Sequence, residues 1–467
     1  MKKQELPMLT TAQLLNLCIG FFGLQFAWQM RIILSGPVTE PLGASPFIFS
    51  LIWLAGPITG LVVQPIIGAM SDSLGKRKPF LLIGAVLAGL ALWGFPFSKE
   101  IVETFSQLTN IPVPAWGALF VAALFIWIID ACVNAAQGPY RALIPDIAPE
   151  KQHALANSYI SFAVGLGSVI AAGTAPFLSK FANYTMSINA QFVMAALAFT
   201  LGVIWTCSMI KERGAEKKIT DEPQEKISFT DSLKSFFSAS KEVYKVCAVQ
   251  FFTWIGIMSM FIYFTQFAVH NVFGVPDLAN ATEAVKQSFA TAKTQGELFS
   301  GACFTWFNLI CFIVSIPIGI MASKFGNKKV HMISLIIMGC SFIGMVFTTN
   351  TVFITALMAL AGIGWASTLA IPFAMLSEFI KKGTEGSAMG IFNIFIAGPQ
   401  VFVCTILGYI IMKSPVKGDV LNYHWEYAFL IGGISILIAA IMTTLIKEKK
   451  PAEPVLQEAK DLQEIGS

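Results

Sequence analysis

Residues 68–78 of the chain read GAMSDSLGKRK, and residues 319–329 read GIMASKFGNKK. Two glycines occupy the same places in both stretches, Gly68 with Gly319 and Gly75 with Gly326, and a basic pair ends each stretch. Basic loops alone would follow from the excess of Lys and Arg in cytoplasmic loops, whereas a shared glycine spacing would not. The two stretches therefore predict an internal repeat that divides the chain into two similar halves.

The composition around these stretches is that of a membrane protein. Of the 467 residues, 55% are hydrophobic and 12% are charged, against about 25% charged residues in a soluble protein. Lipid leaves only helices or closed barrels as spanning structures, and the apolar runs lack the two-residue alternation of a barrel. We therefore expect an all-α membrane protein with twelve transmembrane helices. The predicted spans are roughly 9–34, 47–70, 80–97, 116–144, 153–178, 189–210, 245–270, 299–322, 330–349, 351–377, 386–412 and 426–446.

The distribution of Lys and Arg predicts the orientation of the chain. If the N-terminus is cytoplasmic, 24 of these residues lie on its side of the membrane and 6 on the other. Because cytoplasmic loops are rich in Lys and Arg, both termini are predicted to be cytoplasmic. The charge-rich segment 211–244 divides the spans six and six. The predicted parts are an N-terminal six-helix half (1–210), a cytoplasmic linker (211–244), a C-terminal six-helix half (245–446) and a cytoplasmic tail (447–467).

A polar stripe marks the fourth span, where residues 128–147 read IIDACVNAAQGPYRALIPDI. At about 100° per residue, Asp130, Asn134, Gln137 and Arg141 lie within about 60° of one another around a helix. A carboxylate at the depth of Asp130 must face the bundle interior or water. It either exchanges a proton as part of the function or forms a permanent contact between helices, and intramembrane acids favour the first. Arg141 either faces a cavity or extends to the headgroups, and the two amides either bind a ligand or join helices.

Amides and tryptophans recur in the other predicted spans. This combination suits a neutral ligand rich in hydroxyl groups, because aromatic rings pack against sugar C–H faces and amides bind hydroxyls. With Asn134 and Gln137, the candidate substrate-binding residues are Gln25, Trp28, Gln29, Gln64, Asn308, Trp365, Asn393 and Gln400. Arg31 is expected either to extend to the outer face, tied to Glu40, or to act as a gate. His270, at the outer end of the seventh span, is expected at the wet interface, with proton handling as the less favoured alternative.

The stretch 68–78 resembles the loop signature of the major facilitator superfamily, GxxxDxxGKRK. In that family the acid and the basic residues latch the cytoplasmic ends of helices in the outward-facing state. The resemblance implies a conformational latch formed by Gly68, Asp72, Gly75, Arg77 and Lys78. The internal repeat adds Glu378, which follows the tenth span as Asp146 follows the fourth.

Residues 51–72, 128–147, 365–376 and 389–400 are similar to the sucrose/proton symporters of plants and their animal and bacterial relatives, in the glycoside-pentoside-hexuronide group. The similarity runs through nearly all twelve spans. It implies the major facilitator fold and proton-coupled uptake of a disaccharide or glucoside. It also implies a proton-coupling role for Asp130 and Arg141, and the same resemblance covers Gln25, Trp28, Asn393 and Gln400.

Two features depart from the plant pattern. Where the plant proteins have FDTD in span seven, this chain has Tyr263, Phe264, Thr265 and Gln266, so both acids are gone. Arg31 stands where the plant first span has a neutral amide. The short loop after span two is more similar to that of a bacterial relative.

We therefore expect a multi-pass transporter of the inner or plasma membrane that moves a sugar of the sucrose or maltose class inward with a proton. The alternatives are a sodium-coupled or uncoupled transporter and, less favoured, a membrane sugar sensor. The spans contain no protease or nucleophile motif, and no GxxxxGK[ST] phosphate loop is present, so neither an enzyme nor an ATP-driven pump is expected. The expected partners are the sugar, the proton and the bilayer, with no cofactor, metal or nucleic acid, for a monomeric protein.

Overall fold

The computed structural model describes the chain except for residues 1–6, 212–240, 279–280, 380–384, 417–421 and 448–467. Most of the predicted linker (211–244) and nearly all of the predicted tail (447–467) therefore lie outside the described residues. The residues that are described confirm the all-α class. They form helices throughout, and their only β pairing is an isolated bridge between Pro415 and Tyr423.

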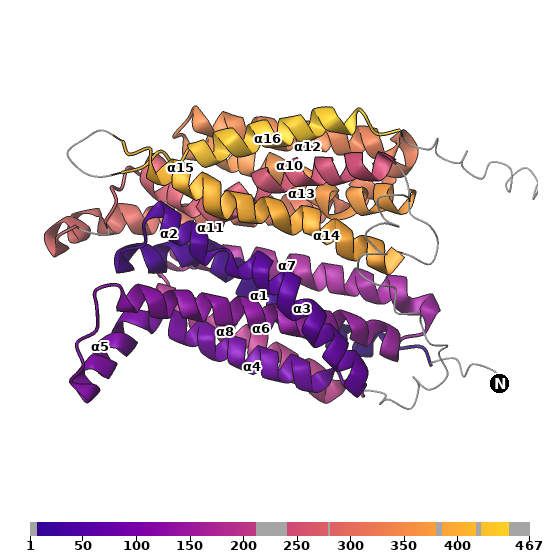
Figure 1. Cartoon of the computed structure of the whole chain (residues 1–467), viewed down its shortest axis with the longest axis horizontal. Helices are drawn as coiled ribbons and strands as arrows, with labels where there is room; N and C mark the ends of the chain where they lie inside the picture. The colour runs from indigo at the N-terminus through magenta and orange to yellow at the C-terminus, as the bar shows by residue number, and fades with distance from the viewer. Residues whose placement is uncertain (1–6, 212–240, 279–280, 380–384, 417–421, 448–467) are drawn as a thin grey trace, which may run out of the picture.

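The first part of the chain forms a group of packed helices, called here the N-terminal group (Figure 1). Its elements are α1 (Thr11–Thr39), η1 (Glu40–Leu42), α2 (Pro46–Ile52), α3 (Ala55–Leu74), α4 (Lys78–Gly94), η2 (Phe95–Phe97), α5 (Ser98–Thr109), α6 (Gly117–Ile147), α7 (Glu150–Ala182) and α8 (Ile188–Met209).

The C-terminal group lies beside the first, coloured from rose through orange to yellow in Figure 1. Its elements are α10 (Lys241–Gln266), the π-helical η4 (Phe267–Val272), α11 (Glu283–Phe325), α12 (Asn327–Val346), α13 (Thr351–Ser377), α14 (Glu385–Phe402), the π-helical η5 (Val403–Leu407), α15 (Gly408–Met412) and α16 (Tyr427–Thr443).

The described helices make the chain a multi-pass membrane protein. Eleven of the described spans are long and apolar enough to cross a bilayer. The helix α16 is also apolar but has 17 residues, fewer than the other candidates. The predicted number of twelve transmembrane helices therefore stays a prediction.

Three predicted spans differ from the helices that form. The second span is interrupted at Trp53 and Leu54, between α2 and α3. Pro57 accounts for the break, because its ring clashes with the carbonyl four residues earlier, that of Trp53. The eighth helix begins at Glu283 rather than near 299, because a polar helical segment precedes its apolar run. The short helix α5 lies outside all the predicted spans, because it is amphipathic rather than continuously apolar.

Glycines allow matching helix pairs in the two groups to pack closely. A Cβ atom at Gly23 of α1 would lie 2.1 Å from the carbonyl oxygen of Ala198 on α8. In the C-terminal group, a Cβ atom at Gly256 of α10 would lie 2.6 Å from the carbonyl oxygen of Gly432 on α16. Small residues at helix crossings let backbones approach, as is common in membrane bundles. The first and last long helices of each group therefore pack in the same way.

The two ends of the bundle have different features, and each is named here after one residue. At the Gly75 end, α3 turns into α4 at Gly75, and α11 turns into α12 at Gly326. Their φ angles of 61° and 90° fall in the region that favours glycine, which explains the glycine at both positions. The Glu40 end carries η1, α5 and η4, and lies on the left in Figure 1.

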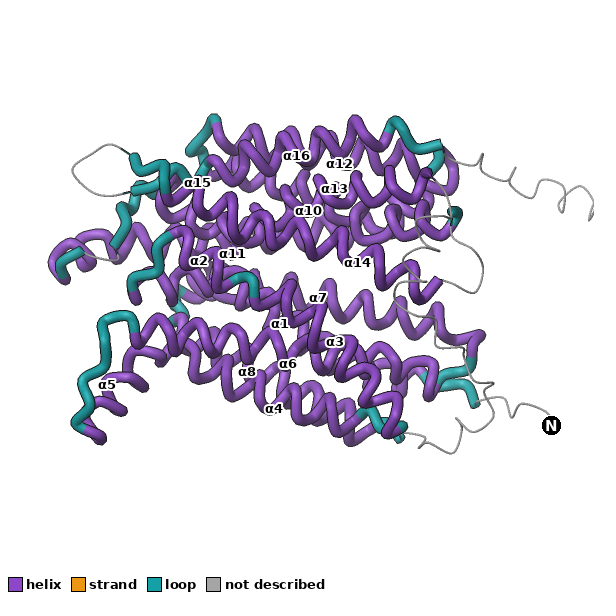
Figure 2. The backbone as a smooth tube through the Cα atoms, viewed as in Figure 1, coloured by secondary structure: helices purple, strands orange, loops and turns teal. Residues whose placement is uncertain are grey.

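Among the described residues, polar contacts join the two groups near the Glu40 end and in the middle of the bundle. Near the Glu40 end, Ser50 Oγ donates a hydrogen bond to the carbonyl oxygen of Cys404 at 2.7 Å, and Glu40 lies 3.4 Å from His270. In the middle, Asn308 Nδ2 donates to Gln29 Oε1 at 3.1 Å. The helices α3 and α14 extend from the middle of the bundle toward the Gly75 end (Figure 2).

Candidate functional site

A buried ion pair forms the centre of the candidate site. Arg31 Nη2 on α1 donates to Asp130 Oδ2 on α6 at 2.6 Å, and the two side chains are 1% and 0% exposed. Both residues belong to the N-terminal group, in the interior of candidate membrane spans. An ionised carboxylate at this depth needs compensation, and the guanidinium supplies it.

The position of Arg31 corrects one expectation. Arg31 does not extend to the outer face and is not tied to Glu40, because its side chain is buried against Asp130. A signal for this pairing is present in the sequence. Arg31 lies eight residues before the end of α1 and Asp130 thirteen residues after the start of α6, so the two charges have comparable depths from the Glu40 end. Intramembrane charges of opposite sign at similar depths commonly pair.

Two tryptophan rings hold the guanidinium of Arg31. Its Cζ atom lies 4.3 Å from the ring centroid of Trp53 and 5.2 Å from that of Trp28. Trp53 is fully buried at the break between α2 and α3, where the chain leaves the helical path. An aromatic face stabilises a desolvated cation by about 2 kcal/mol or more. Sequence reasoning named Trp28 as a substrate residue and missed Trp53 altogether.

The centre of the site has unused hydrogen-bonding capacity. Within the described part of the chain, Arg31 Nε and Nη1 and Asp130 Oδ1 are inaccessible and lack hydrogen-bond partners. Gln29 Nε2 also lacks a partner, although Gln29 lies two residues from Arg31 and so on nearly the opposite side of α1. Buried polar atoms in proteins are usually hydrogen-bonded, so a cluster of such atoms is uncommon. The cluster offers several donors and one carboxylate acceptor to any hydroxylated molecule that reaches it.

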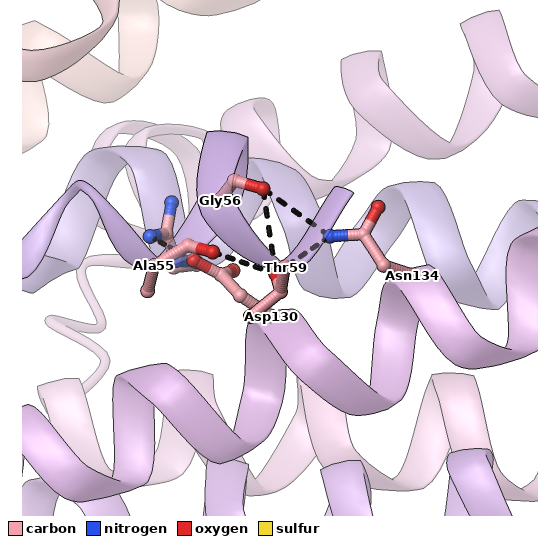
Figure 3. Close-up of polar contacts among 6 residues, drawn as sticks. Ala55, Gly56, Thr59, Asp130 and Asn134 are labelled. Carbon is pink, nitrogen blue, oxygen red and sulfur yellow. Dashed lines mark hydrogen bonds and ion pairs between the residues drawn. The ribbon is translucent and has the colours of Figure 1, made fainter. Parts of the chain in front are cut away.

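The polar stripe of α6 faces the start of α3 near Asp130 (Figure 3). Asn134 Nδ2 donates to Thr59 Oγ1 at 3.0 Å and to the carbonyl oxygen of Gly56 at 3.4 Å. Along the stripe, exposure rises from the buried Asp130 through the half-buried Asn134 and Gln137 to the exposed Arg141. The stripe therefore leads from a closed interior toward the Gly75 end.

The remaining candidate substrate residues are distributed over both groups. Gln29 and Asn308 meet in the hydrogen bond between α1 and α11. Trp365 on α13 lies in an aromatic cluster, with ring centroids 5.7 Å from Trp254 and 5.4 Å from Phe261. Elsewhere, Asn393 is exposed, and the half-buried candidates are Gln25, Gln64 and Gln400. The structure thus brings some of these residues into contact and leaves others apart.

A second polar cluster lies at the Glu40 end, and it corrects the expectation for His270. His270 is 3% exposed rather than wet, and its Nε2 lies 3.4 Å from Glu40 Oε2. Its ring stacks on Trp425, with centroids 5.5 Å apart and an interplanar angle of 15°. The backbone N–H of Leu278 also donates to Glu40 Oε1 at 3.5 Å. The cluster connects η1 of one group with η4 of the other.

The residues implied as a latch lie at the Gly75 end. Arg77 Nε donates to Asp146 Oδ2 at 2.9 Å, and Arg77 Nη1 donates to Ser71 Oγ at 2.9 Å. In the C-terminal group, Asn327 Nδ2 donates to Glu378 Oε1 at 3.1 Å. These contacts are made within each group. Nearby, Lys78 begins α4, a Cβ atom at Gly68 would meet nothing within 4 Å, and the side chain of Asp72 is outside the described residues.

Comparisons with known proteins agree on one family. The family model described as Major Facilitator Superfamily matches residues 17–291 and 278–465. A sucrose transport protein of Oryza sativa subsp. indica is 27% identical over 424 residues, which cover 82% of this chain and 83% of that protein. A general alpha-glucoside permease of Schizosaccharomyces pombe is 24% identical over 528 residues, covering 94% of each chain. The crystal structure of the nucleoside transporter NupG has a TM-score of 0.66 at 13% identity, covering 94% of this chain and 99% of that one, which supports the fold alone.

Proposed function

Because the chain belongs to the Major Facilitator Superfamily and the relatives described above are transporters and not enzymes, we propose that it carries a disaccharide or related glucoside into the cell together with a proton. The substrate class, sucrose or maltose type, is inferred from the sucrose transport protein and the alpha-glucoside permease that the chain resembles. Proton coupling is inferred from the buried pair of Arg31 and Asp130.

The observation that carries the proposal is the ion pair of Arg31 and Asp130, in which each side chain has no other hydrogen-bond partner among the described residues. With Asp130 ionised, the pair is neutral and Arg31 is compensated through Nη2. A proton on Asp130 would leave the guanidinium charged and without its counter-ion in a dry site, which is costly. New acceptors would then have to reach Arg31, and sugar hydroxyls are suitable acceptors. Proton binding and sugar binding would therefore favour each other, as coupling requires.

The residues around the pair support a hydroxylated ligand. Gln29 has an unpartnered Nε2 while its Oε1 accepts from Asn308, so these two amides join the two groups of helices two residues from Arg31 along α1. Trp28, which directly precedes Gln29 in the sequence, contacts the guanidinium with its ring. We propose that a sugar binds here, with further contacts supplied on one side by Asn134, Gln137, Gln25 and Gln64 and on the other by Trp365, Asn393 and Gln400.

We further propose that the two groups are the two halves of an alternating-access carrier. In this proposal the Gly75 end and both termini are cytoplasmic, and the Glu40 end faces outward. Contacts such as Glu40 with His270 and Ser50 with Cys404 would close the outer end in the conformation described. Arg77 and Glu378, now paired within their own groups, would contribute to the cytoplasmic latch of the opposite conformation. Arg141, exposed toward the Gly75 end, would assist proton release.

Transport into liposomes tests the proposal. The purified protein, reconstituted under an inward proton gradient, is expected to accumulate labelled sucrose or maltose, and a protonophore is expected to abolish the accumulation. Asp130→Asn should lose accumulation, whereas Glu103→Gln, at an exposed carboxylate on α5, should keep it. Accumulation that follows a sodium gradient, or equilibration that ignores both gradients, would contradict proton coupling. No uptake of any glucoside would contradict the proposed substrate class.

A further inference from the structure

The short helix α5 has no part in the proposed transport site, yet it is a distinct feature of the Glu40 end. It comprises Ser98–Thr109, between η2 and α6, and it projects from the end of the bundle at the lower left of Figure 1 and Figure 2. It is too short and too polar to cross a membrane. Its sequence, SKEIVETFSQLT, alternates apolar and polar residues with a helical period.

Its side chains fall into sectors around the helix axis, of which the one opposite the protein carries the polar Glu100 and Thr104. At about 100° per residue, Val102 and Ser106 lie within about 40° of each other and are half-buried, so this sector faces the protein. On one flank, three apolar side chains lie within about 60° of one another, namely Ile101, Phe105 and Leu108. The opposite flank carries only polar side chains, namely Lys99, Glu103 and Gln107.

The sector facing the protein fixes the helix in place. The position of a Cβ atom at Gly117, the first residue of α6, lies 3.7 Å from a methyl group of Val102. Ser106 Oγ donates to the carbonyl oxygen of Ile111 at 2.8 Å, and Asn110 ends the helix with a φ of 53°. Helix and following loop therefore form one unit against α6, and the two flanks keep constant directions relative to the bundle.

The apolar flank of α5 is exposed. Ile101, Phe105 and Leu108 are 40%, 51% and 79% exposed. The spanning helices that precede and follow α5 also carry exposed large apolar side chains near this end, with Trp93 on α4 and Trp116 just before α6. Tryptophan is enriched at the boundary between lipid and water. Both spanning helices next to α5 therefore carry a residue typical of the lipid boundary near this end.

The polar flank is equally consistent with a boundary position. Lys99 Nζ lies 3.8 Å from Glu103 Oε1, one helical turn away, and these side chains are mostly exposed. Such a pair is stable in water and would be poorly placed in hydrocarbon. A helix with an apolar flank opposite a charged one lies in the plane of the interface, with its apolar face among the acyl chains.

We propose that α5 is an interfacial helix, whose apolar flank of Ile101, Phe105 and Leu108 inserts into the lipid leaflet at the Glu40 end while Lys99, Glu103 and Gln107 face water. The occupant of the apolar flank is lipid, and neither solvent nor a second copy of the chain covers it. The inference is independent of the substrate and of proton coupling.

Site-specific photo-crosslinking in liposomes tests this inference on the full chain. A benzophenone amino acid is introduced at Phe105 or Leu108, and in matched controls at Glu103 or Gln107, and gel filtration selects the folded protein. After illumination, mass spectrometry of the α5 peptide is expected to show lipid adducts severalfold more abundant at Phe105 and Leu108 than at the two controls. Equal, low adduct levels at all four positions would place α5 in water and overturn the inference. Crosslinked dimers from Phe105 or Leu108 in place of lipid adducts would also overturn it, since a second copy would then be the occupant.

Discussion

At the scale of single residues, the proposed mechanism depends on how Arg31 is held. One carboxylate oxygen and two tryptophan rings surround its guanidinium, while two of its nitrogens have no described hydrogen-bond partner. Breaking a buried ion pair on one side leaves the other charge uncompensated, which is more costly than removing both charges. The two halves of the pair are therefore expected to be strongly coupled in stability.

Replacing one or both members of the pair measures this coupling. Asp130→Asn should lower the free energy of unfolding by about 3–5 kcal/mol, because Arg31 is then buried without a counter-charge. The double variant Arg31→Gln with Asp130→Asn removes both charges and should recover most of the loss. Thermal unfolding in one detergent compares the three proteins. A double variant no more stable than Asp130→Asn would contradict the account of the pair.

Trp53 provides a second test at this scale, through the pH dependence of uptake. The positive charge of Arg31 opposes proton binding to Asp130, so a loosened guanidinium lets the carboxylate bind a proton at a lower proton concentration. Trp53→Leu, which removes the ring face, should shift half-maximal uptake to higher pH. Trp53→Phe keeps a ring, and the indole Nε1 has no described partner to lose, so its profile should stay near that of the unmodified protein. Identical profiles for all three proteins would rule out a positioning role for Trp53.

The sequence predicts how deep a residue lies in its span more readily than it predicts which side chain that residue contacts. The expected interior position of Asp130 agrees with its burial, whereas its role in proton coupling stays a prediction. The contact with Arg31 could not be assigned with certainty, because helix rotation decides which side chains face each other and no local pattern specifies it. The burial of His270 could not be predicted for the same reason, since a histidine at a span end is buried only when another group of helices covers it.

At the scale of helices, apolar runs locate the long spans well and their irregularities poorly. Pro57 marks the break between α2 and α3 in the sequence, because a proline disrupts the turn before it. Hydropathy misses α5 and the first turns of α11, where half of each helix surface is polar. These irregular parts matter for the proposed mechanism, since the break carries Trp53 and the Glu40 end carries the contact between η1 and η4.

The contact between Glu40 and His270 gives a prediction about these elements. If it helps to close the Glu40 end, His270→Gln should open that end more often. A cysteine in place of Ser35, which is fully buried on α1, should then react severalfold faster with a membrane-impermeant maleimide added outside. Glu283→Gln, which removes an exposed pair with Lys286 on α11, is the matched control and should leave the rate unchanged. Equal rates in all backgrounds, after subtracting the native cysteines, would show that the contact does not close this end.

At the scale of the whole molecule, the two groups of helices share features of arrangement, as an internal repeat in the sequence would predict. The glycine turns at Gly75 and Gly326 and the glycine crossings of α1 with α8 and α10 with α16 occur at matching places. The charged pair of Arg31 and Asp130 belongs to the N-terminal group alone, while Gln29 and Asn308 reach across. In the proposed mechanism, a bound sugar connects the proton on Asp130 with the contact between the two groups.

Direct measurement of proton movement tests the central claim most sharply. Proteoliposomes without an imposed gradient are mixed with sucrose or maltose in a weakly buffered medium, and the external pH is recorded. Symport predicts a sugar-dependent rise in external pH as protons enter with the sugar, and Asp130→Asn should abolish this rise while Glu103→Gln keeps it. Sugar entry at an unchanged external pH, or an undiminished rise in Asp130→Asn, would contradict proton coupling through the pair of Arg31 and Asp130.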